Sequence, residues 1–306
     1  MATQALIADS RTIGTLFSGN IDDYPEGIII PIDKPYRWTS ADVVRKIKRA
    51  ACRHFGKKNL KVGHAGTLDP LATGVLLVCI GKACRQAETL QKESKEYVAG
   101  ISFGATTPSY DLEKAVDKLY PHDNVSEKTV SETLPKFVGE QEQVAPLFSA
   151  KSVDGVRAYE LARKQFKDRG LAKTDVIDGF DHSVAETLNV QKITIYQMEL
   201  LAFEPGQEAV TPLNNAIVKG PDGRINVADT SGLDLPLATI RVSCSKGTYI
   251  RALARDLGEA LGTGAHLNSL RRTKSGGFNV ETALSVTQAV SLFTTKDQET
   301  PAGQDN

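Results

Sequence analysis

Gly63-His64-Ala65-Gly66-Thr67-Leu68-Asp69-Pro70-Leu71-Ala72-Thr73-Gly74 is the most constrained stretch of the sequence. Its three glycines, one proline and two threonines predict a tight loop. The glycine spacing fits neither GxGxxG nor GxxxxGKS/T, so the loop does not indicate a nucleotide-binding fold. An apolar run at 75–80 follows directly and predicts a buried strand.

Asp69 is one of two acidic residues in the most basic part of the chain. Residues 34–85 hold twelve Lys and Arg side chains against Asp42 and Asp69, a local net charge of +10. Surrounding cations keep a carboxyl group ionised, which suits a nucleophile or a base better than a general acid. An Asp before a proline is also a common turn-capping residue, and the loop alone leaves both interpretations open.

The whole chain is neutral, with 37 basic and 37 acidic residues, but its charge is unevenly divided. A second basic segment, residues 241–275, holds seven Lys and Arg against two acidic residues, a net of +5. If the two basic segments fold together, they give one positive face, which is typical of proteins that bind a phosphate backbone. The alternative is that the cations at 45–53 form only the solvated face of a helix.

The second basic segment contains two further candidates for function. Arg251 follows SKGTYI at 245–250, where a helix is predicted to begin and a cation opposes the helix dipole. An anion such as Asp69 or a phosphate would hold it there; otherwise the side chain extends into solvent. In LNSLRR at 267–272, the two arginines either grip phosphates or form a charged edge over a small core.

Periodicity along the rest of the chain predicts a mixture of strands and helices. Strands are predicted at 27–33, 75–80, 97–103, 190–198 and 238–244, and helices after 39–40, after 81, around 130–138 and 159–162, at 250–261 and at 284–293. Because they do not follow a strict βαβ order, we expect an α+β fold with a mixed, largely antiparallel central sheet flanked by helices.

Composition excludes several classes of protein. With 306 residues, 41% hydrophobic and 24% charged, the chain is globular in composition and not disordered throughout. The apolar runs have strand length and no signal-peptide pattern is present, so we expect no membrane span and a cytoplasmic protein. The four cysteines are scattered and no HxxxH or HExxH motif occurs, so we expect reduced cysteines and no metal site.

Taken together, these motifs resemble the tRNA pseudouridine synthase B family, whose members isomerise uridine 55 in the T-arm of tRNA. The matching segments run in family order across residues 27–278, and GHAGTLDPLATG is the most specific of them. They are GIIIPIDKPYRWTS at 27–40, KVGHAGTLDPLATGVLLVCIG at 61–81, Lys95-Glu96-Tyr97, FSAKSVDGVRAYELAR at 148–163, SKGTYIRALARDLG at 245–258, and 264–278.

The resemblance implies a pseudouridine synthase fold and a role for each of five residues. Asp69 would be the catalytic aspartate, His64 would support the flipped-nucleotide loop, Tyr97 would stack on the base, Arg251 would pair with the aspartate, and Leu270 would line the pocket. The reaction breaks the N1–C1′ bond, turns the base and rejoins it through C5 without redox change, so no cofactor is expected. The attack of Asp69 on C1′, its attack on C6 and a glycal route all stay open.

Extrusion of the target base is a further implication of the resemblance. Unstacking costs about a few kcal/mol, part of which an aromatic such as Tyr97 recovers by stacking on the base. Three substitutions depart from the family pattern, at Arg37 (commonly glycine), Ala145-Pro146 (commonly two prolines) and Phe148 (commonly tyrosine). We expect these to affect packing or loop shape rather than activity.

We expect three parts along the chain. An N-terminal extension covers 1–26, a catalytic domain covers 27–278 with a surface insertion at about 204–236, and a helix with a polar tail covers 279–306. The 28 residues after Phe278 leave no room for the C-terminal PUA domain that bacterial members often carry. The two basic segments, with insertions at 167–186 and 204–236, would then hold the T-arm alone.

The expected partner is the T-arm of tRNA, bound by a monomer with no obligate protein partner and no membrane. One alternative is the catalytic subunit of a guide-RNA pseudouridylation complex, but such subunits carry a PUA domain. The other is a tRNA-binding folding chaperone without essential catalysis. The intact set of Asp69, Tyr97 and Arg251 argues against chaperoning as the only role, and the two activities could coexist.

Overall fold

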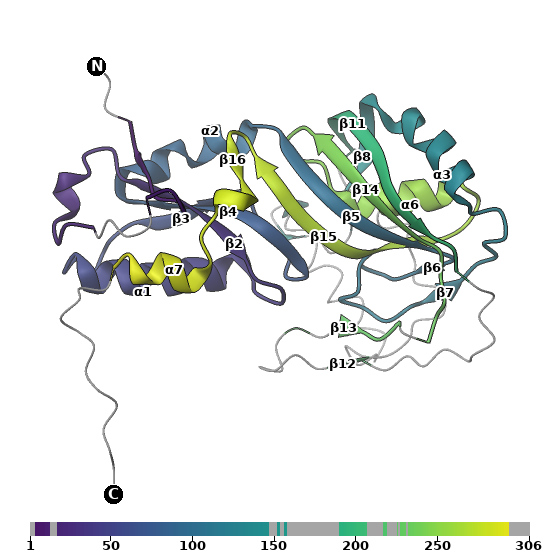
Figure 1. The fold of residues 1–306 in the computed structure, drawn as a ribbon, viewed down its shortest axis with the longest axis horizontal. Coiled ribbons are helices and arrows are strands. Elements are labelled where there is room, and N and C mark those ends of the chain that lie inside the picture. The colour runs from purple at the N-terminus through teal and green to yellow at the C-terminus, as the bar shows by residue number, and fades with distance from the viewer. Residues whose placement is uncertain are drawn as a thin grey trace, which may run out of the picture. The chain divides into compact units, whose positions relative to one another are not determined.

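The computed structural model describes residues 4–12, 17–146, 152–153, 156–157, 190–206, 217–218, 225, 227–230 and 232–293. The chain divides into two units, shown as ribbons in Figure 1. The first unit consists of residues 1–93 and 272–306, and the second of residues 94–271.

β4 (Ala72–Ile80) is the central strand of the first unit. It pairs antiparallel with the whole length of β2 (Ile28–Lys34), and the end of β4 also pairs with the shorter β3 (Val62–Ala65). β1 (Leu6–Ile7) joins β2 in parallel. Nearly every residue of β2 and β4 is buried, which explains why both read as continuous apolar runs in the sequence.

Helices and short segments complete the first unit. They are η1 (Ile21–Asp23), α1 (Ser40–His54), η2 (Gly81–Gln86), α2 (Ala87–Lys92), β16 (Phe278–Asn279), η4 (Val280–Thr282) and α7 (Val286–Ser291). α1 and α7 pack side by side (Figure 1). The Phe17 and Phe293 rings, 5.0 Å apart, pack with Phe55 and join the N-terminal segment to the C-terminal helix.

The second unit is built on a four-stranded antiparallel sheet in the order β5 (Lys95–Phe103), β14 (Leu237–Cys244), β11 (Val190–Glu204) and β8 (Gly139–Val144). β14 alternates between buried and half-buried residues. The helical elements are α3 (Glu127–Thr133), η3 (Leu134–Phe137) and α6 (Ile250–Ala260). The small hairpins are β6 (Ala105–Thr106) with β7 (Lys118–Leu119), β9 (Ser152–Val153) with β10 (Val156–Arg157), and β12 (Ile217–Val218) with β13 (Val227–Ala228). β15 (Ala265–Ser275) begins in this unit and ends in the first.

The largely antiparallel α+β architecture predicted from the sequence is confirmed. The helix expected after Thr39 or Ser40 is α1, and Thr39 caps it through a capping box with Asp42. Residues 265–275 form a strand that the periodicity did not reveal. The helix expected at 159–162, the insertion at 167–186 and most of 204–236 lie outside the described residues, and the domain boundaries at 26 and 278 stay predictions.

The described residues contain neither a helix that could span a membrane nor a metal-binding cluster. None of their helices combines the length and apolar character that crossing a membrane requires. Their His, Cys, Asp and Glu side chains form no group of three or more that could hold a metal ion.

Candidate active site

The structure divides the five predicted site residues between the two units. His64 lies on β3, and Asp69 lies on the loop between β3 and β4, both in the first unit. Tyr97 lies on β5, Arg251 on α6 and Leu270 on β15, all in the second unit. Each unit therefore holds part of the predicted site.

The loop that carries Asp69 turns sharply at both ends. Gly66 has a φ of +92°, a left-handed conformation that costs a residue with a side chain about 1–2 kcal/mol. The Ala72 N–H donates to the Asp69 carbonyl at 3.1 Å and closes a turn just before β4. The turn considered from the sequence thus exists, and this hydrogen bond uses the backbone of Asp69. The Asp69 side chain is half-buried.

Lys34, at the end of β2, is a fully buried cation that contacts this loop. Its Nζ donates to the carbonyls of Pro35 (3.0 Å), Trp38 (2.5 Å) and Pro70 (3.2 Å). Because Pro70 follows Asp69, the last hydrogen bond ties β2 to the loop. Burial lowers the pKa of Lys34 to about 8, while the negative charge of Asp69 acts in the opposite direction.

The start of α1 holds the residue that precedes Asp69. Ser40 Oγ accepts from the Leu68 N–H at 2.9 Å and donates to the Leu68 carbonyl at 3.1 Å. Ser40 is itself fixed as the first residue of α1, behind the Thr39 cap. One side chain therefore satisfies both polar groups of the Leu68 backbone and anchors the Asp69 loop to the start of α1.

Arg37 occupies a backbone conformation that favours glycine. Its φ is +63°, and its N–H donates to the Pro70 carbonyl at 3.0 Å. Its buried Nε has no hydrogen-bond partner among the described residues. The glycine that is common at this position in the resembled family would adopt the same turn without strain.

Arg272, near the end of β15, is the bulkiest fully buried side chain of the described residues. Its Nε donates to the Val75 carbonyl at 2.7 Å, Nη1 to the Thr67 carbonyl at 3.3 Å, and Nη2 to the Gly66 carbonyl at 3.1 Å. Both interpretations drawn from the sequence, a phosphate grip and an exposed charged edge, are wrong for Arg272. It is an internal support of the aspartate loop.

His64 is half-buried on the strand that leads into the loop. Burial and the positive charge of Arg272 lower the pKa of His64, so the ring is neutral at pH 7. Its buried Nδ1 has no hydrogen-bond partner in the part of the chain that the structure describes. A neutral imidazole here offers hydrogen bonding rather than positive charge.

Arg251, the second residue of α6, is a buried cation of the second unit. Its Nη1 donates to the Ser109 carbonyl at 3.1 Å, and its Nε lies 3.7 Å from the Asp111 carboxylate. The solvent-exposed alternative is therefore wrong. The sequence correctly indicated that an anion must hold this arginine at the start of a helix.

Asp111 is a site residue that sequence reasoning missed. Its carboxylate accepts from Ser109 Oγ at 2.6 Å and from the Glu113 N–H at 3.0 Å. Tyr110, between them, has a φ of +56°, and this left-handed residue lets Ser109 and Asp111 both contact Arg251. The only signal in the sequence was the expected need of Arg251 for an anion, which does not single out one acid.

Tyr97 and Leu270 lie on neighbouring strands of the second unit. Tyr97 is paired with Val242 of β14, and β15 runs along the other edge of β5. The two strands approach so closely that a Cβ on Gly100 would lie 2.6 Å from Ser269 Oγ. Tyr97 and Leu270 are each 9% exposed, so both side chains form part of a covered wall rather than of the open surface.

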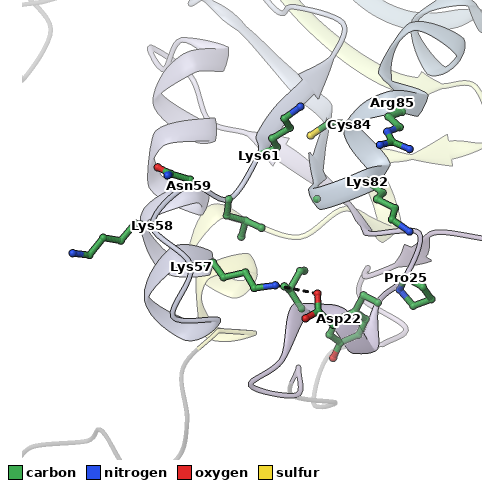
Figure 2. A pocket seen from close by; sticks show the side chains of 13 residues that line it. Asp22, Pro25, Lys57, Lys58, Asn59, Lys61, Lys82, Cys84 and Arg85 are labelled. Carbon is green, nitrogen blue, oxygen red and sulfur yellow. Dashed lines mark hydrogen bonds and ion pairs between the residues drawn. The ribbon is translucent and has the colours of Figure 1, made fainter.

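A basic pocket of about 890 Å³ lies in the first unit, at the end of β4 away from Asp69 (Figure 2). Five cations line it, namely Lys57, Lys58, Lys61, Lys82 and Arg85. Asp22 of η1 forms an ion pair with Lys57 at 3.0 Å, and Glu26 lies 3.9 Å from Lys82. Five of the twelve cations of the basic stretch at 34–85 thus gather around this pocket.

Comparisons with known proteins identify the family of this chain. The model of the TruB family pseudouridylate synthase (N terminal domain) matches residues 53–211, and that of the tRNA pseudouridylate synthase B C-terminal domain matches residues 251–301. The tRNA pseudouridine synthase B of Phocaeicola vulgatus is 44% identical over 264 residues, which are 86% of this chain and 92% of the relative. That of Bacteroides fragilis is 42% identical over 277 residues, 90% of this chain and 98% of the relative.

A solved structure shares the fold. A chain in the crystal structure of a Cbf5–Nop10–Gar1 complex superposes with a TM-score of 0.54 and 27% sequence identity. The match covers 89% of this chain and 56% of that chain, so the present sequence spans just over half of this neighbour. This likeness supports the predicted fold class.

Proposed function

Because the chain belongs to the TruB family and is a tRNA pseudouridine synthase, we propose that it isomerises uridine 55 in the T-arm, with Asp69 as its catalytic group. The observation that carries the proposal is the Asp69 loop. Its backbone is held by Ser40, Lys34 and Arg272, so the carboxylate is presented from a fixed turn. Such preorganisation is what a covalent or acid–base step requires.

The reaction needs an aspartate and a shaped pocket but no net change of redox state. The N1–C1′ bond breaks, the base turns, C5 bonds to C1′, C5 loses its proton and N1 gains one. Asp69 would act at C1′, at C6 or in an elimination to a glycal, and Tyr97 would stack on the extruded base. Leu270 would line the same pocket.

His64 and Arg251 would assist without bond making. A neutral, half-buried His64 on the strand that leads into the loop is suited to contact the flipped nucleotide without adding positive charge. Arg251, oriented by Ser109 and Asp111, would keep Asp69 ionised and aligned. The proposal therefore requires Asp69 of the first unit to work together with Tyr97, Arg251 and Leu270 of the second.

The basic pocket in Figure 2 is our candidate for holding the backbone of the T-arm. Lysines and arginines that neutralise phosphates supply affinity without base specificity. β4 separates this pocket from the Asp69 loop by about 25 Å, given a rise of about 3.3 Å per residue, so one RNA must span several nucleotides to reach both.

Tritium release tests the proposal directly. A T-arm stem-loop carrying [5-³H]uridine only at position 55 is compared with one labelled only at position 54, with RNA binding followed in parallel. Release from position 55 alone, abolished in Asp69→Asn with binding retained, is the expected result. Binding without release by the wild type would instead favour the folding chaperone.

We also infer that the enzyme is a cytoplasmic monomer that needs no protein partner. The lining of the basic pocket comes from a single chain and from its first unit, so this pocket forms without a second subunit. Light scattering coupled to size-exclusion chromatography, with and without the stem-loop, checks this. A single 33.0 kDa species and a 1:1 complex are expected.

A further inference from the structure

Arg272 contacts the Asp69 loop on both sides of the aspartate. Gly66 and Thr67, which accept from its Nη atoms, come before Asp69, and Val75, which accepts from Nε, comes after it on β4. One rigid planar group therefore joins the two arms of the loop. We infer that Arg272 is a positioning residue for Asp69, an inference that rests on the catalytic role proposed above.

The chemistry of the contacts requires an arginine. A guanidinium presents its N–H donors in a fixed plane, so that three carbonyls can be held in a set arrangement. A lysine is shorter in reach and donates from a single nitrogen. Lys34 shows the difference, because its three acceptors come from Pro35, Trp38 and Pro70, all close to one point.

The charge of Arg272 acts together with its hydrogen bonds. The three groups that accept from Arg272 are uncharged carbonyls, and no carboxylate of the described residues is bonded to it, so its positive charge is not cancelled. Burial lowers the pKa of His64 and of Lys34, which both adjoin the loop, and the charge of Arg272 lowers both further. Arg272 therefore brings an uncompensated positive charge to the same loop that it holds by hydrogen bonds.

Gly74 provides an independent sign that this approach is built into the fold. Its φ is +103°, and a Cβ there would lie 2.2 Å from the Arg272 carbonyl oxygen. The absence of a side chain lets the backbones of β4 and β15 come close together at this one point. The Arg272 side chain can then extend beneath the loop to Gly66, whose own Cβ would lie 3.6 Å from Nη1.

The test compares Arg272→Lys, which keeps the charge, and Arg272→Met, which does not, with the same two substitutions at Arg271. Arg271 is the next residue on β15 and its side chain faces the other side of the strand. Single-turnover pseudouridine formation, RNA dissociation constants and melting curves are measured, with rates taken well below each melting temperature.

For Arg272→Lys, we expect the rate constant to fall about 100-fold, as for a catalytic group displaced by about 1 Å. The RNA dissociation constant should change less than about threefold, because no phosphate contact is lost. Arg271, for which the phosphate grip stays a prediction, is the comparison for RNA contact: its variants should weaken RNA binding without lowering the rate constant at saturating RNA. A lower melting temperature with an unchanged rate would overturn the inference in favour of a purely structural role, and weaker RNA binding with an unchanged rate would overturn it in favour of RNA contact.

Two further readouts separate positioning from folding. In Arg272→Ala, added guanidinium should restore part of the rate, and methylammonium, which has charge but no planar fork, should not. Amide hydrogen exchange over residues 66–72 should accelerate in Arg272→Lys and not in Arg271→Lys. Exchange does not depend on RNA, so it judges the clamp even if the wild type forms no pseudouridine and the proposed function fails; unchanged exchange would contradict the inference.

Discussion

The two buried arginines of the candidate site, Arg272 and Arg251, are held in different ways. Arg272 donates to three backbone carbonyls, whereas Arg251 donates to the Ser109 carbonyl and also faces a carboxylate, that of Asp111, at 3.7 Å. Carbonyls leave the cation its charge and become fixed themselves, while a carboxylate offsets the charge and orients the cation. Arg272 therefore holds the backbone of the Asp69 loop, and Asp111 orients the Arg251 side chain.

The largest expected effects come from removing the charge of Arg251 or of Arg272. We expect Arg251→Met and Arg272→Met each to lower the free energy of unfolding by about 3–5 kcal/mol, since both leave buried polar partners unsatisfied. Adding Asp111→Asn should recover more than half of the loss in Arg251→Met, because it removes the stranded charge. The same addition should recover nothing in Arg272→Met. Urea unfolding checks all four variants, and equal recovery in both backgrounds would refute the contrast.

The close approach behind Arg272 can be tested without touching the arginine. Gly74→Ala combines a φ of +103° with a Cβ only 2.2 Å from the β15 backbone, so we expect a loss of about 2–3 kcal/mol. Gly63→Ala is the matched control, because a Cβ there meets nothing within 4 Å. Thermal and urea unfolding of the two variants should differ clearly; similar values would mean that the backbones can separate at little cost.

Lys34 differs from the two buried arginines because it can lose its charge in an accessible pH range. Above its pKa of about 8, the neutral amine donates two hydrogen bonds instead of three, and the longest, to Pro70, is the one expected to be lost. We expect the rate of isomerisation to fall about threefold to tenfold between pH 7 and pH 9. The charged groups that act on Lys34 are Asp33, Asp42, Asp69 and Arg272.

Stability should move in the opposite direction over the same range. The folded-state pKa of Lys34 lies below the value of 10.5 for the free side chain, so between pH 8 and pH 10.5 the unfolded chain binds more protons. The contribution of Lys34 to the free energy of unfolding therefore rises with pH in this window. Lys34→Met should remove both trends relative to the wild type, and a wild-type profile retained in that variant would assign them to another group.

The smallest effect is expected at Arg37, whose hydrogen bond to the loop comes from its backbone N–H. Arg37→Gly removes the strain of a φ of +63° and an unpartnered Nε, and should stabilise the protein by about 0.5–1 kcal/mol. Arg37→Ala keeps a Cβ and should gain less. Calorimetric melting of the two variants checks the order; a destabilised glycine variant would mean that the arginine side chain packs favourably.

The fold was largely predictable because its elements carry strong local signals. β2 and β4 are continuous apolar runs, and α1 begins at a capping box, so each is visible in a short window of sequence. β15 was not predicted as a strand, because Arg271 and Arg272 interrupt its apolar pattern. The apolar pattern of a buried strand is broken there because the buried residue is Arg272. Its burial is explained by its hydrogen bonds to the Asp69 loop.

The candidate site was predictable where residue types are unusual in their place and not elsewhere. Asp69 stood out as an acid among cations, and Arg251 as a cation at a helix start. Asp111 did not, since an acid after Thr-Pro-Ser-Tyr is ordinary in a turn. Its role depends on Tyr110 adopting a left-handed backbone conformation and on a contact 140 residues away along the chain, between Asp111 and Arg251.

The ion pairs at the mouth of the basic pocket have a consequence for how RNA binding responds to salt. Asp22 and Glu26 act as counterions that the chain itself carries, one beside Lys57 and one beside Lys82. A phosphate that enters displaces a tethered carboxylate instead of releasing an ion into solution. Each such exchange flattens the dependence of affinity on salt, which for a free cation would be about 0.7–0.9 log units per log unit of salt. We therefore expect the pocket to attract RNA less strongly at low ionic strength, and its affinity for RNA to change less when the ionic strength rises.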